Sequence, residues 1–216
     1  MILKYLIVIN FLIFLVHLNA SEIILKKDGS YRLISNIHLV NEVAYKKEAY
    51  QALIEIPAGT IAKWEVNHTT GHLEWEFKKD KPRNVKFLPY PGNYGFIPQT
   101  ILDKNEGGDG DPLDIIVLSS AVQRGSVQEV KILGAIKLLD KGEQDDKIIA
   151  IPTNSPFNKI DSIGEMMVKF PGVVEIVRYW FEGYKGSKIQ FMGYMKKKEA
   201  ELLIEKAHKS WQRHNN

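Results

Sequence analysis

The stretch 107–114 carries the most specific chemical demand in this sequence. It reads Gly-Gly-Asp-Gly-Asp-Pro-Leu-Asp and places Asp109, Asp111 and Asp114 directly before the apolar run 115–118. Like charges this close repel one another, and burying them without a counter-charge would be very costly. The glycines allow the backbone to bend so that the carboxylates converge, and a hard divalent cation would neutralise them. The motif therefore predicts a metal site, and a catalytic one.

Other ionisable residues carry little information when each is considered alone. Glu55 stands between Ile54 and Ile56 in an expected strand, and strict alternation would turn its side chain toward solvent. Lys63 and Glu65 alternate with apolar neighbours in the same way. Each of these positions alone is typical of a solvated strand face.

Two further groups also have ordinary structural explanations. Asp140, Asp145 and Lys147 surround an acidic segment that is typical of a hairpin turn ahead of a strand. Tyr184 and Lys185 come at the end of an expected helix, where a cation is favourable.

Read together, these segments resemble the family I soluble inorganic pyrophosphatases over about residues 40–195. The likeness is carried by five blocks in order: Glu55-Ile56-Pro57 with Lys63; Arg83 ahead of Tyr90-Pro91-Gly92-Asn93-Tyr94-Gly95; Gly108 to Asp114; Asp140 with Asp145 and Lys147; and Tyr184-Lys185. That family hydrolyses pyrophosphate to two phosphates with several Mg2+ ions and no covalent enzyme intermediate. The resemblance therefore implies this activity, with pyrophosphate as substrate and Mg2+ as cofactor.

The resemblance also implies a ligand set. Asp109, Asp114 and Asp145 would hold a first metal ion, and Asp114 would be shared with a second. Asp140 and Asp145 would bind the Mg2+ that arrives with the substrate, and Glu55 a further ion. Two metals that share a water lower its pKa, which yields a bridging hydroxide for direct attack on phosphorus.

The remaining matched residues would act on the reacting groups. Asp111 would be the general base that takes the proton of the attacking water. Phosphate oxygens would be held by Lys63, Arg83, Tyr94, Lys147, Tyr184 and Lys185. Glu65 and Lys188 are further candidates for supporting contacts. Because Asp145 and Asp146 are adjacent, the register decides which one is the ligand, and we expect Asp145.

Hydrophobic patterns predict a mainly β chain with a helical C-terminal third. Strands are expected at 50–56, 61–66, 73–77, 114–118, 128–138 and 147–151, with a structured loop at 85–98. A helix is expected to begin at Ser162, to break at Pro171-Gly172 and to continue with an apolar stripe. A last helix is expected at 197–211. The resemblance implies a small closed OB-type β-barrel flanked by C-terminal helices, and a homo-oligomer, hexameric in bacterial relatives.

The first twenty residues form a separate unit. Lys4 is their one Lys, Arg, Asp or Glu, and an apolar stretch follows to residue 18. This stretch is shorter than the about 20 apolar residues of a membrane span. Its length and the small Ala20-Ser21 predict a signal peptide at 1–20, a single domain at 21–216, and a periplasmic or secreted protein with no stable membrane contact after cleavage. An uncleaved anchor or a buried helix stays open, and the cytoplasm is the family's usual location.

Composition narrows the function classes. A chain of 216 residues with 44% apolar residues suits one well-buried domain, and the absence of cysteine excludes disulfides, thiol catalysis and thiolate ligands. The net charge of +3 is too small to indicate nucleic acid, and the central acidic cluster would repel a polynucleotide. We therefore expect no nucleic-acid partner, and the same charges disfavour a second alternative, an aromatic-rich β-barrel that binds nucleic acid.

A non-catalytic calcium-binding protein is the main alternative. Residues 103–114 have the length of an EF-hand loop, with Gly108 at its sixth position. However, Gly107 and Gly110 stand where a ligand and an apolar residue are usual. The last ligand would be Asp114 instead of Glu, and the loop runs into an expected strand and not a helix.

Overall fold

The fold is described from a computed structural model of the chain. The structure describes residues 23–46, 49–186 and 188–215. The predicted signal peptide at 1–20 and its cleavage point lie outside the described residues. Within those residues, no helix has the length and apolar character needed to cross a bilayer.

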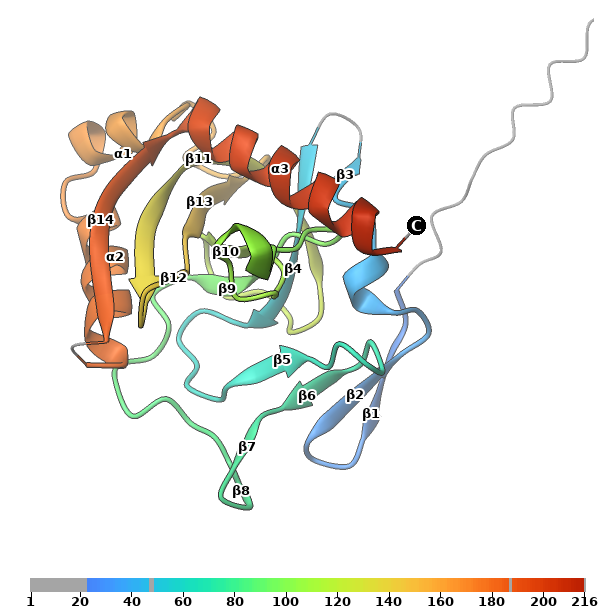
Figure 1. Cartoon of the computed structure of the whole chain (residues 1–216). Coiled ribbons are helices and arrows are strands. Elements are labelled where there is room, and N and C mark those ends of the chain that lie inside the picture. Colours follow the sequence, from blue (N-terminus) through green and yellow to red (C-terminus); the bar gives the residue numbers. More distant parts are fainter. Residues whose placement is uncertain (1–22, 47–48, 187, 216) are drawn as a thin grey trace, which may run out of the picture.

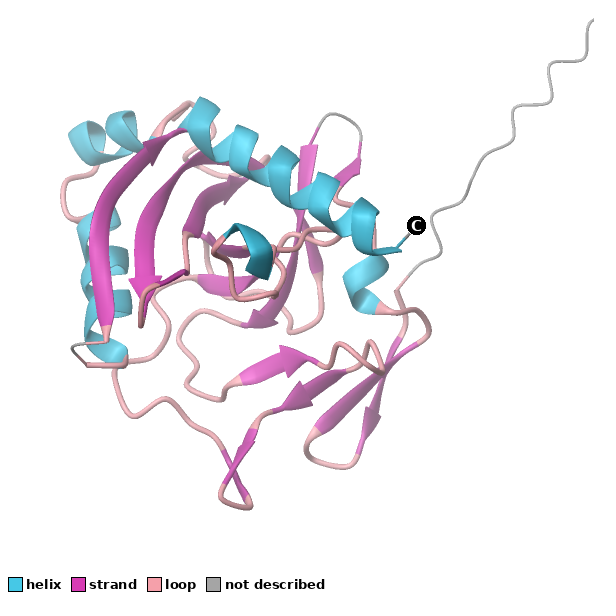
Figure 2. Ribbon diagram, in the orientation of Figure 1, coloured by secondary structure: helices cyan, strands magenta, loops and turns pink. Residues whose placement is uncertain are grey.

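The described part of the chain is mostly β-structure with three α-helices (Figures 1 and 2). The strands are β1 Leu25–Asp28, β2 Arg32–Ser35, β3 Tyr45–Lys46, β4 Ala49–Ile56, β5 Trp64–Val66, β6 Leu73–Trp75, β7 Phe77–Lys78, β8 Lys81–Pro82, β9 Asn93–Phe96, β10 Asp114–Val117, β11 Val127–Asp140, β12 Glu143–Gln144, β13 Lys147–Pro152 and β14 Ile189–Lys196. The helices are α1 Ile163–Lys169, α2 Val173–Tyr184 and α3 Lys197–Asn215, with short 3-10 turns η1 Leu39–Asn41 and η2 Lys104–Glu106.

Five strands form a ring of hydrogen-bonded neighbours. Strand β4 pairs with β9, β9 with β10, β10 with β13 and β13 with β11, and β11 returns to pair with β4. The β10–β13 pair is parallel and the others are antiparallel. A ring of short strands is the arrangement of a small β-barrel. The predicted fold class, mainly β with helices around an OB-type barrel, is confirmed.

Apolar side chains fix the helices on the barrel. Helices α1 and α2 share a core with it that includes Ile116, Ile149, Met166, Val177 and Phe181. Helix α3 packs on another side, where Ala200, Ile204 and Ala207 meet the barrel strands. A third cluster joins β4 to the smaller β1-β2-β6-β5 sheet. Burial of a large aliphatic or aromatic side chain contributes about 1.5–3 kcal/mol, so these three clusters stabilise the packing of the helices and the smaller sheet on the barrel.

The predicted helix boundaries are largely confirmed. The Ser162 hydroxyl accepts a hydrogen bond from the backbone N–H of Glu165 at 3.1 Å and caps α1. Gly172, with φ +93°, separates α1 from α2. Ile176, which we expected in the apolar stripe of α2, is instead 61% exposed. Helix α3 runs past the predicted end at 211 to Asn215.

The predicted loop at 85–98 contains a barrel strand, β9, so the loop prediction was wrong there. The segment is rich in Pro, Gly and aromatic residues, which is typical of a loop. Gly95 does not mark a loop but a close approach of two strands, because a Cβ at this position would lie 1.8 Å from the Leu53 carbonyl oxygen. Glycine therefore allows the backbones of β9 and β4 to approach, and no larger residue fits. Six further strands were not predicted either: β1, β2, β3, β8, β12 and β14.

Candidate active site

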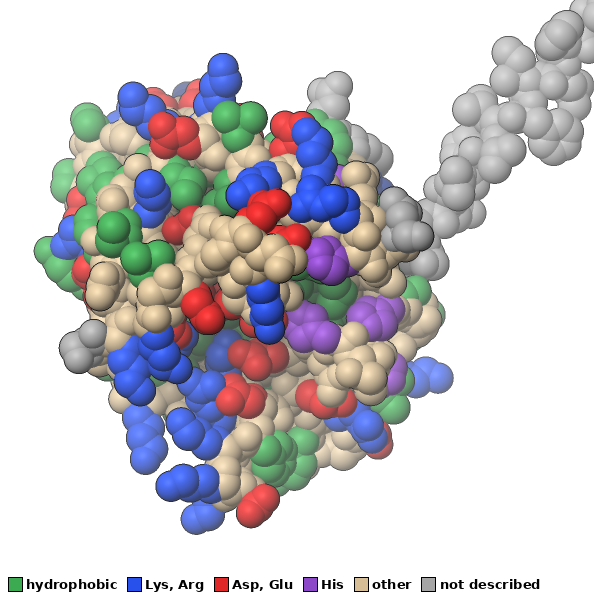
Figure 3. Space-filling model, in the orientation of Figure 1, with side chains coloured by type: hydrophobic (Ala, Val, Ile, Leu, Met, Phe, Trp, Pro, Cys, Tyr) green, Lys and Arg blue, Asp and Glu red, His purple; other side chains and the backbone are tan. Residues whose placement is uncertain are grey.

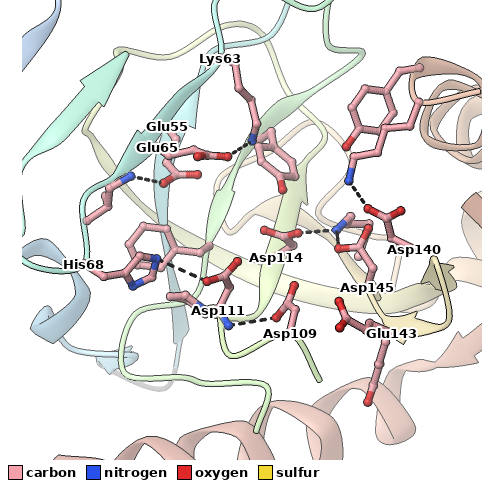
Figure 4. Close-up of a pocket in the computed structure, with 18 of the residues that line it drawn as sticks. Glu55, Lys63, Glu65, His68, Asp109, Asp111, Asp114, Asp140, Glu143 and Asp145 are labelled. Carbon is pink, nitrogen blue, oxygen red and sulfur yellow. Dashed lines mark hydrogen bonds and ion pairs between the residues drawn. The ribbon is translucent and has the colours of Figure 1, made fainter. Parts of the chain in front are cut away.

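A cavity of about 360 Å3 opens beside one end of the barrel, between β5, the 107–114 loop and the end of α2 (Figure 4). All the residues predicted for the site line it: Glu55, Lys63, Arg83, Tyr94, Asp109, Asp111, Asp114, Asp140, Asp145, Lys147, Tyr184 and Lys185. The candidate Glu65 lines it too, whereas Lys188 is not among the lining residues. Segments far apart in sequence therefore meet in one charged pocket.

Glu55 enters the cavity because β4 carries a bulge at this residue. Ile54 pairs with Gly95 and Ile56 with Tyr94, so Glu55 is the extra residue between two register positions. The side chain is buried, and its Oε1 accepts a hydrogen bond from the Val66 N–H at 2.7 Å. The single-residue interpretation of Glu55 as solvated was wrong, because the bulge breaks the alternation on which it rested.

Burial is also the main cause of a shifted pKa at this residue. It raises the pKa of Glu55 to about 8, and the nearby Lys63 ammonium lowers it again only in part. A further cation bound beside the carboxyl group would therefore stabilise its charged form.

Lys63 is buried as well, which again contradicts the solvated-strand interpretation, whereas Glu65 is exposed as expected. The Lys63 ammonium lies 2.6 Å from Glu65 Oε1 and 5.1 Å from the centroid of the Tyr94 ring. Burial alone would lower the pKa of Lys63, but Tyr90 and the carboxyl groups of Glu65 and Glu55 outweigh it and raise the pKa. The ammonium is therefore charged at the wall of the cavity.

Lys147 occupies the centre of the acidic side of the pocket. Its side chain is 2% exposed, its Nζ lies 2.6 Å from Asp145 Oδ1, and it also donates to the Asp114 carboxylate. Burial lowers its pKa, but these two carboxylates outweigh burial and raise it. One protein cation thus already offsets part of the charge of two predicted metal ligands.

The structure separates the two adjacent aspartates. Asp145 faces the cavity, whereas Asp146 is buried, accepts a hydrogen bond from the Leu138 N–H at 3.0 Å and another from the Gln144 side chain at 2.6 Å. Asp146 therefore stabilises the β11–β12 hairpin, whereas Asp145 is positioned to contact a ligand in the cavity.

The acidic loop presents Asp109 and Asp111 on one rim of the cavity. Gly107 and Gly110 both have φ +89°, a conformation that favours glycine, and the Asp111 N–H donates to Asp109 Oδ1 at 2.9 Å. Loss of solvent contact raises the pKa of Asp109 to about 6 and also raises the pKa of Asp111. His68 Nε2 lies 3.7 Å from Asp111 Oδ1 and lowers the pKa of Asp111 in part.

The opposite rim is built by α2 and the end of β11. Lys185 Nζ lies 2.7 Å from Asp140 Oδ2, and the other carboxylate oxygen, Asp140 Oδ1, is buried with no hydrogen-bond partner. Tyr184 stacks on Trp180, with ring centroids 4.7 Å apart and planes at 14°, which fixes the phenol at the cavity. Asp140 therefore offers a free, buried oxygen beside a cation.

Arg83 stands where the β7–β8 hairpin meets the cavity. Its NH1 lies 2.5 Å from Glu76 Oε2, and this hydrogen bond raises its pKa although burial lowers it. The single bond leaves other guanidinium N–H groups to face a ligand.

Sequence reasoning missed three polar residues that line the cavity: His68, Glu143 and Gln144. His68 lies in the turn after β5, and the other two form the short strand β12. None has a motif of its own in the sequence, and only the folded register brings them to the site.

The loop 103–114 does not have EF-hand geometry. Asp103, its first position, caps η2 through the Asn105 N–H and lies 3.7 Å from Arg213 of α3, outside the cavity lining. The loop ends in strand β10, and residues 97–103 before it contain no helix. The helix–loop–helix frame is therefore missing, which weakens the calcium-binding alternative.

The charge of the cavity favours bound divalent cations. Eight carboxyl groups line it against four Lys and Arg side chains, so an anionic ligand would be repelled by the lining alone. Among the described residues, no three His, Asp or Glu side chains have the spacing of a metal centre. The donors nevertheless fit Mg2+ chemically, because they are hard carboxylate oxygens and Asp140 Oδ1 lacks any partner.

Comparison with known proteins agrees with this geometry. The inorganic pyrophosphatase family profile matches residues 52–212. The chain belongs to the inorganic pyrophosphatase family. It is 36% identical over 209 residues to an inorganic pyrophosphatase of Drosophila melanogaster, which covers 86% of this chain and 62% of that protein. It is 33% identical over 213 residues to one of Candida glabrata, which covers 88% of this chain and 74% of that protein.

Solved pyrophosphatase structures share the fold. The structure of an inorganic pyrophosphatase from Schistosoma japonicum superposes with a TM-score of 0.76 at 31% sequence identity, covering 90% of this chain and 76% of that one. The chain spans less than two thirds of the length of the Drosophila relative, so it corresponds to part of that longer protein.

Proposed function

We propose that this chain hydrolyses inorganic pyrophosphate to two phosphates with the aid of Mg2+. The observation that carries the proposal is the single cavity in which carboxylates face lysine, arginine and tyrosine side chains from five separate segments. Family membership supports the same reaction.

The carboxylates would hold the cations. Asp109, Asp114 and Asp145 are the candidates for the first ion, Asp140 with its free Oδ1 for one that accompanies the substrate, and Glu55 for a further ion. When bound, Mg2+ would neutralise charge on the cavity and the substrate and would activate water near neutral pH.

The cationic side chains would hold the substrate. Lys63, Lys147 and Lys185 are each already held by a carboxylate, so their ammonium groups are fixed before an anion arrives. Arg83 can give a phosphate two parallel hydrogen bonds, and the phenols of Tyr94 and Tyr184 can donate to further oxygens. These donors would stabilise the leaving phosphate as negative charge builds on it.

Asp111 would receive the proton of the attacking water. It lies at the rim of the cavity and stays largely exposed, so its carboxylate can take a proton from a water in the pocket and pass it to solvent. His68, at 3.7 Å, would orient the Asp111 carboxylate.

The decisive experiment is phosphate release from pyrophosphate, with and without Mg2+, by the full chain beside Asp111→Ala. We expect Mg2+-dependent release that falls by about 100-fold or more in the variant. Asp161→Ala, a carboxylate outside the cavity lining, is the matched control and should retain the rate. Absence of release by folded, metal-loaded protein would overturn the proposal in favour of a non-catalytic metal-binding relative.

We also propose that segment 1–20 directs export, that residues 21–216 act as one domain, and that the domain forms a homo-oligomer and scavenges phosphate outside the cytoplasm. Sequencing the N-terminus of the protein from its source tests the first point. A mature chain that retains Met1 and fractionates with the cytosol would overturn it. Sedimentation analysis tests the assembly, and a monomer at all concentrations would contradict it.

A further inference from the structure

Helix α3 contacts the segment that leads into the acidic loop. Segment 99–103 follows β9 and belongs to no helix or strand. The Gln99 carbonyl oxygen accepts a hydrogen bond from His208 Nδ1 at 2.7 Å, and the Ile101 N–H donates to the Ala207 carbonyl oxygen at 3.0 Å. Because Ala207 and His208 are consecutive, both bonds attach the segment to a single turn of α3.

The same segment also contacts the acidic loop. The Leu102 N–H donates to the Asp111 carbonyl oxygen at 2.9 Å, and the Leu102 carbonyl oxygen accepts a hydrogen bond from the Gly110 N–H at 2.8 Å. The Gly108 N–H donates to the Asp103 carbonyl oxygen at 3.0 Å. A Cβ at Gly108 would lie 2.5 Å from the Leu102 carbonyl oxygen, so the two backbones are in direct contact. The segment therefore lies between α3 and the loop that carries predicted metal ligands.

Ion pairs attach the η2 turn to the second half of α3. Arg213 NH2 lies 3.1 Å from Glu106 Oε1 and 3.7 Å from Asp103 Oδ2, and Lys206 Nζ lies 2.8 Å from Glu106 Oε2. Figure 3 shows Lys and Arg side chains beside Asp and Glu side chains on the face that α3 crosses. A single exposed ion pair contributes little, whereas several pairs that share partners can fix a surface turn. These pairs hold η2, which ends directly before Gly107.

Little free space separates the helix from the segment. The cavity between them measures about 10 Å3, room for about one water molecule, and Leu102, Leu203 and Ala207 are among the residues that line it. Side chains packed this closely pass a displacement on to their neighbours. A shift of α3 would therefore move segment 99–103 and, with it, the acidic loop.

The charges of the acidic loop oppose its folded conformation when no metal is bound. Asp109, Asp111 and Asp114 then repel one another, which favours conformations that spread the carboxylates apart. A loop that holds its metal-binding conformation only part of the time binds the ion more weakly, in proportion to that fraction. The hydrogen bonds of Leu102 fix the backbone at Gly110 and Asp111, directly after Asp109, and so favour the binding conformation before the ion arrives.

We propose that His208 and Arg213 are positioning residues for Mg2+ binding. They hold segment 99–103 and η2 on α3, and the segment in turn holds the acidic loop in the conformation that binds the ion. The proposal rests on the Mg2+-dependent function proposed above. Neither residue lines the active-site cavity, so each acts through the backbone of the loop.

The effect of α3 should be partial. The Leu113 N–H donates to Thr100 Oγ1 at 2.9 Å, and the Gln144 N–H donates to the Gly107 carbonyl oxygen at 3.0 Å, so the loop keeps these contacts when α3 is altered. The loss of one hydrogen bond corresponds to a change in affinity of about two- to tenfold. We expect the Mg2+ affinity to fall by this amount and binding to persist.

Two substitutions of His208 separate its hydrogen bond from the packing of its ring. His208→Phe keeps the ring that stacks on Trp211, where the centroids lie 6.0 Å apart, and removes the donor. His208→Asn removes the ring and places an amide N–H near the position of Nδ1, within reach of the Gln99 carbonyl. Calorimetric titration of the full chain with Mg2+ should give a dissociation constant about two- to tenfold higher in His208→Phe, and within about twofold of the parent in His208→Asn.

Arg213 has a matched control on the same helix. Arg213→Gln and Lys209→Gln each remove one positive charge from an exposed side chain, but of the two only Arg213 contacts Asp103 and Glu106, since Lys209 pairs with Glu205. The Mg2+ dissociation constant should rise about two- to fivefold in Arg213→Gln and change by less than about twofold in Lys209→Gln. Arg213→Lys, which keeps the charge, should recover part of the affinity.

Hydrogen exchange in the metal-free protein gives a readout that does not depend on activity. The amide protons of Leu102, Gly108 and Gly110 should exchange about threefold faster or more in His208→Phe, while those of β13 should keep their rates. Unchanged exchange in β13 excludes a general loss of stability, and circular dichroism establishes that each variant is folded.

Three results would overturn the proposal. Equal weakening of Mg2+ binding by His208→Phe and His208→Asn would mean that the ring packing matters and the hydrogen bond does not. Unchanged binding and exchange in both His208→Phe and Arg213→Gln would mean that the other contacts of the loop suffice. Equal losses in Arg213→Gln and Lys209→Gln would mean that only net charge matters.

Phosphate release separates this proposal from the proposed function. In an active chain, His208→Phe should raise the Mg2+ concentration that gives half the maximal rate and should leave kcat at saturating Mg2+ within about twofold. Mg2+ binding that depends on His208, in a chain that releases no phosphate from pyrophosphate, would uphold the positioning role and reject the hydrolase. Phosphate release with the same Mg2+ requirement in every variant would do the reverse, and a chain that binds no Mg2+ would overturn both.

Discussion

The ammonium nitrogen of Lys147 lies 2.6 Å from Asp145 Oδ1, deep in the wall of the cavity. The same ammonium donates to Asp114. Each of these three charged groups would be costly to bury alone, and together they partly neutralise one another. An Mg2+ ion bound to the carboxylates would change this balance of charge, so the stability of the protein should differ with and without the ion.

Lys147→Met should destabilise the protein by about 3–5 kcal/mol without Mg2+, because the variant leaves Asp114 and Asp145 without their cation. Saturating Mg2+ should restore part of this loss, since a bound ion would neutralise the same carboxylates. Urea unfolding with and without Mg2+ measures both effects. Lys137→Met, an exposed β11 lysine, is the control. A loss no larger than that of the control would contradict the prediction.

Asp145→Ala should mainly affect Mg2+ binding and the rate, whereas Asp146→Ala should mainly affect stability. Asp146 accepts hydrogen bonds from the Leu138 N–H and the Gln144 side chain, so its removal leaves a buried donor and should cost about 1–3 kcal/mol of stability. Asp145 lines the cavity, so its loss should lower Mg2+ affinity and the rate, and the loss of stability should be limited because Lys147 keeps Asp114 as its partner. Unfolding curves and Mg2+ titrations of phosphate release separate the two, and the reverse pattern would exchange their roles.

Gly95→Ala should destabilise the barrel by about 1–3 kcal/mol or more, because the added Cβ would lie 1.8 Å from the Leu53 carbonyl oxygen. Gly164→Ala in α1 is the matched control. A Cβ there meets nothing within 4 Å, and alanine should stabilise the helix by about 0.4–1 kcal/mol. Thermal unfolding of the two variants checks the pair. Equal midpoints would show that β9 and β4 can separate at low cost.

Glu165→Gln should be less stable than the parent chain near neutral pH, and the difference in unfolding stability should shrink as the pH falls. Hydrogen bonds from Lys169 and from the Asp161 N–H lower the pKa of Glu165. A depressed pKa means that the stabilisation is present above the ordinary glutamate pKa and is lost as the pH falls through the lower folded value. Unfolding midpoints between pH 6 and pH 3 test this, with Glu129→Gln on β11 as control. A difference that stays constant over this range would contradict the assignment.

Much of the fold was predictable because its signals are local. Strands β4, β10, β11 and β13 coincide with apolar runs, and the caps and breaks of α1 and α2 follow from Ser162 and Gly172. Strand β9 was not predictable from local pattern, because its glycine is needed only where β4 passes. Strand β14 is partly exposed and depends on pairing with β11, which is a tertiary effect.

The candidate site was predictable from the resemblance and not from single residues. Alternation placed Glu55 and Lys63 in solvent, and both are buried, Glu55 because a bulge shifts the register by one residue. His68 has no motif, and it reaches Asp111 only because β5 packs across the barrel end. The charge balance of the cavity is likewise a property of the assembled fold, since its acidic and basic groups come from segments that are distant in sequence.

The β4–β11 pairing joins Leu53 to Val127 and brings the first part of the ring to strands encoded much later. Contacts this distant in sequence form slowly, on the scale of about milliseconds to seconds. During synthesis, the cavity cannot exist until the ribosome has released Tyr184 and Lys185. A chain that is cut short before α2 would carry most of the acidic residues and no complete pocket, so partial products of translation should be inert toward any phosphoanhydride in the cell.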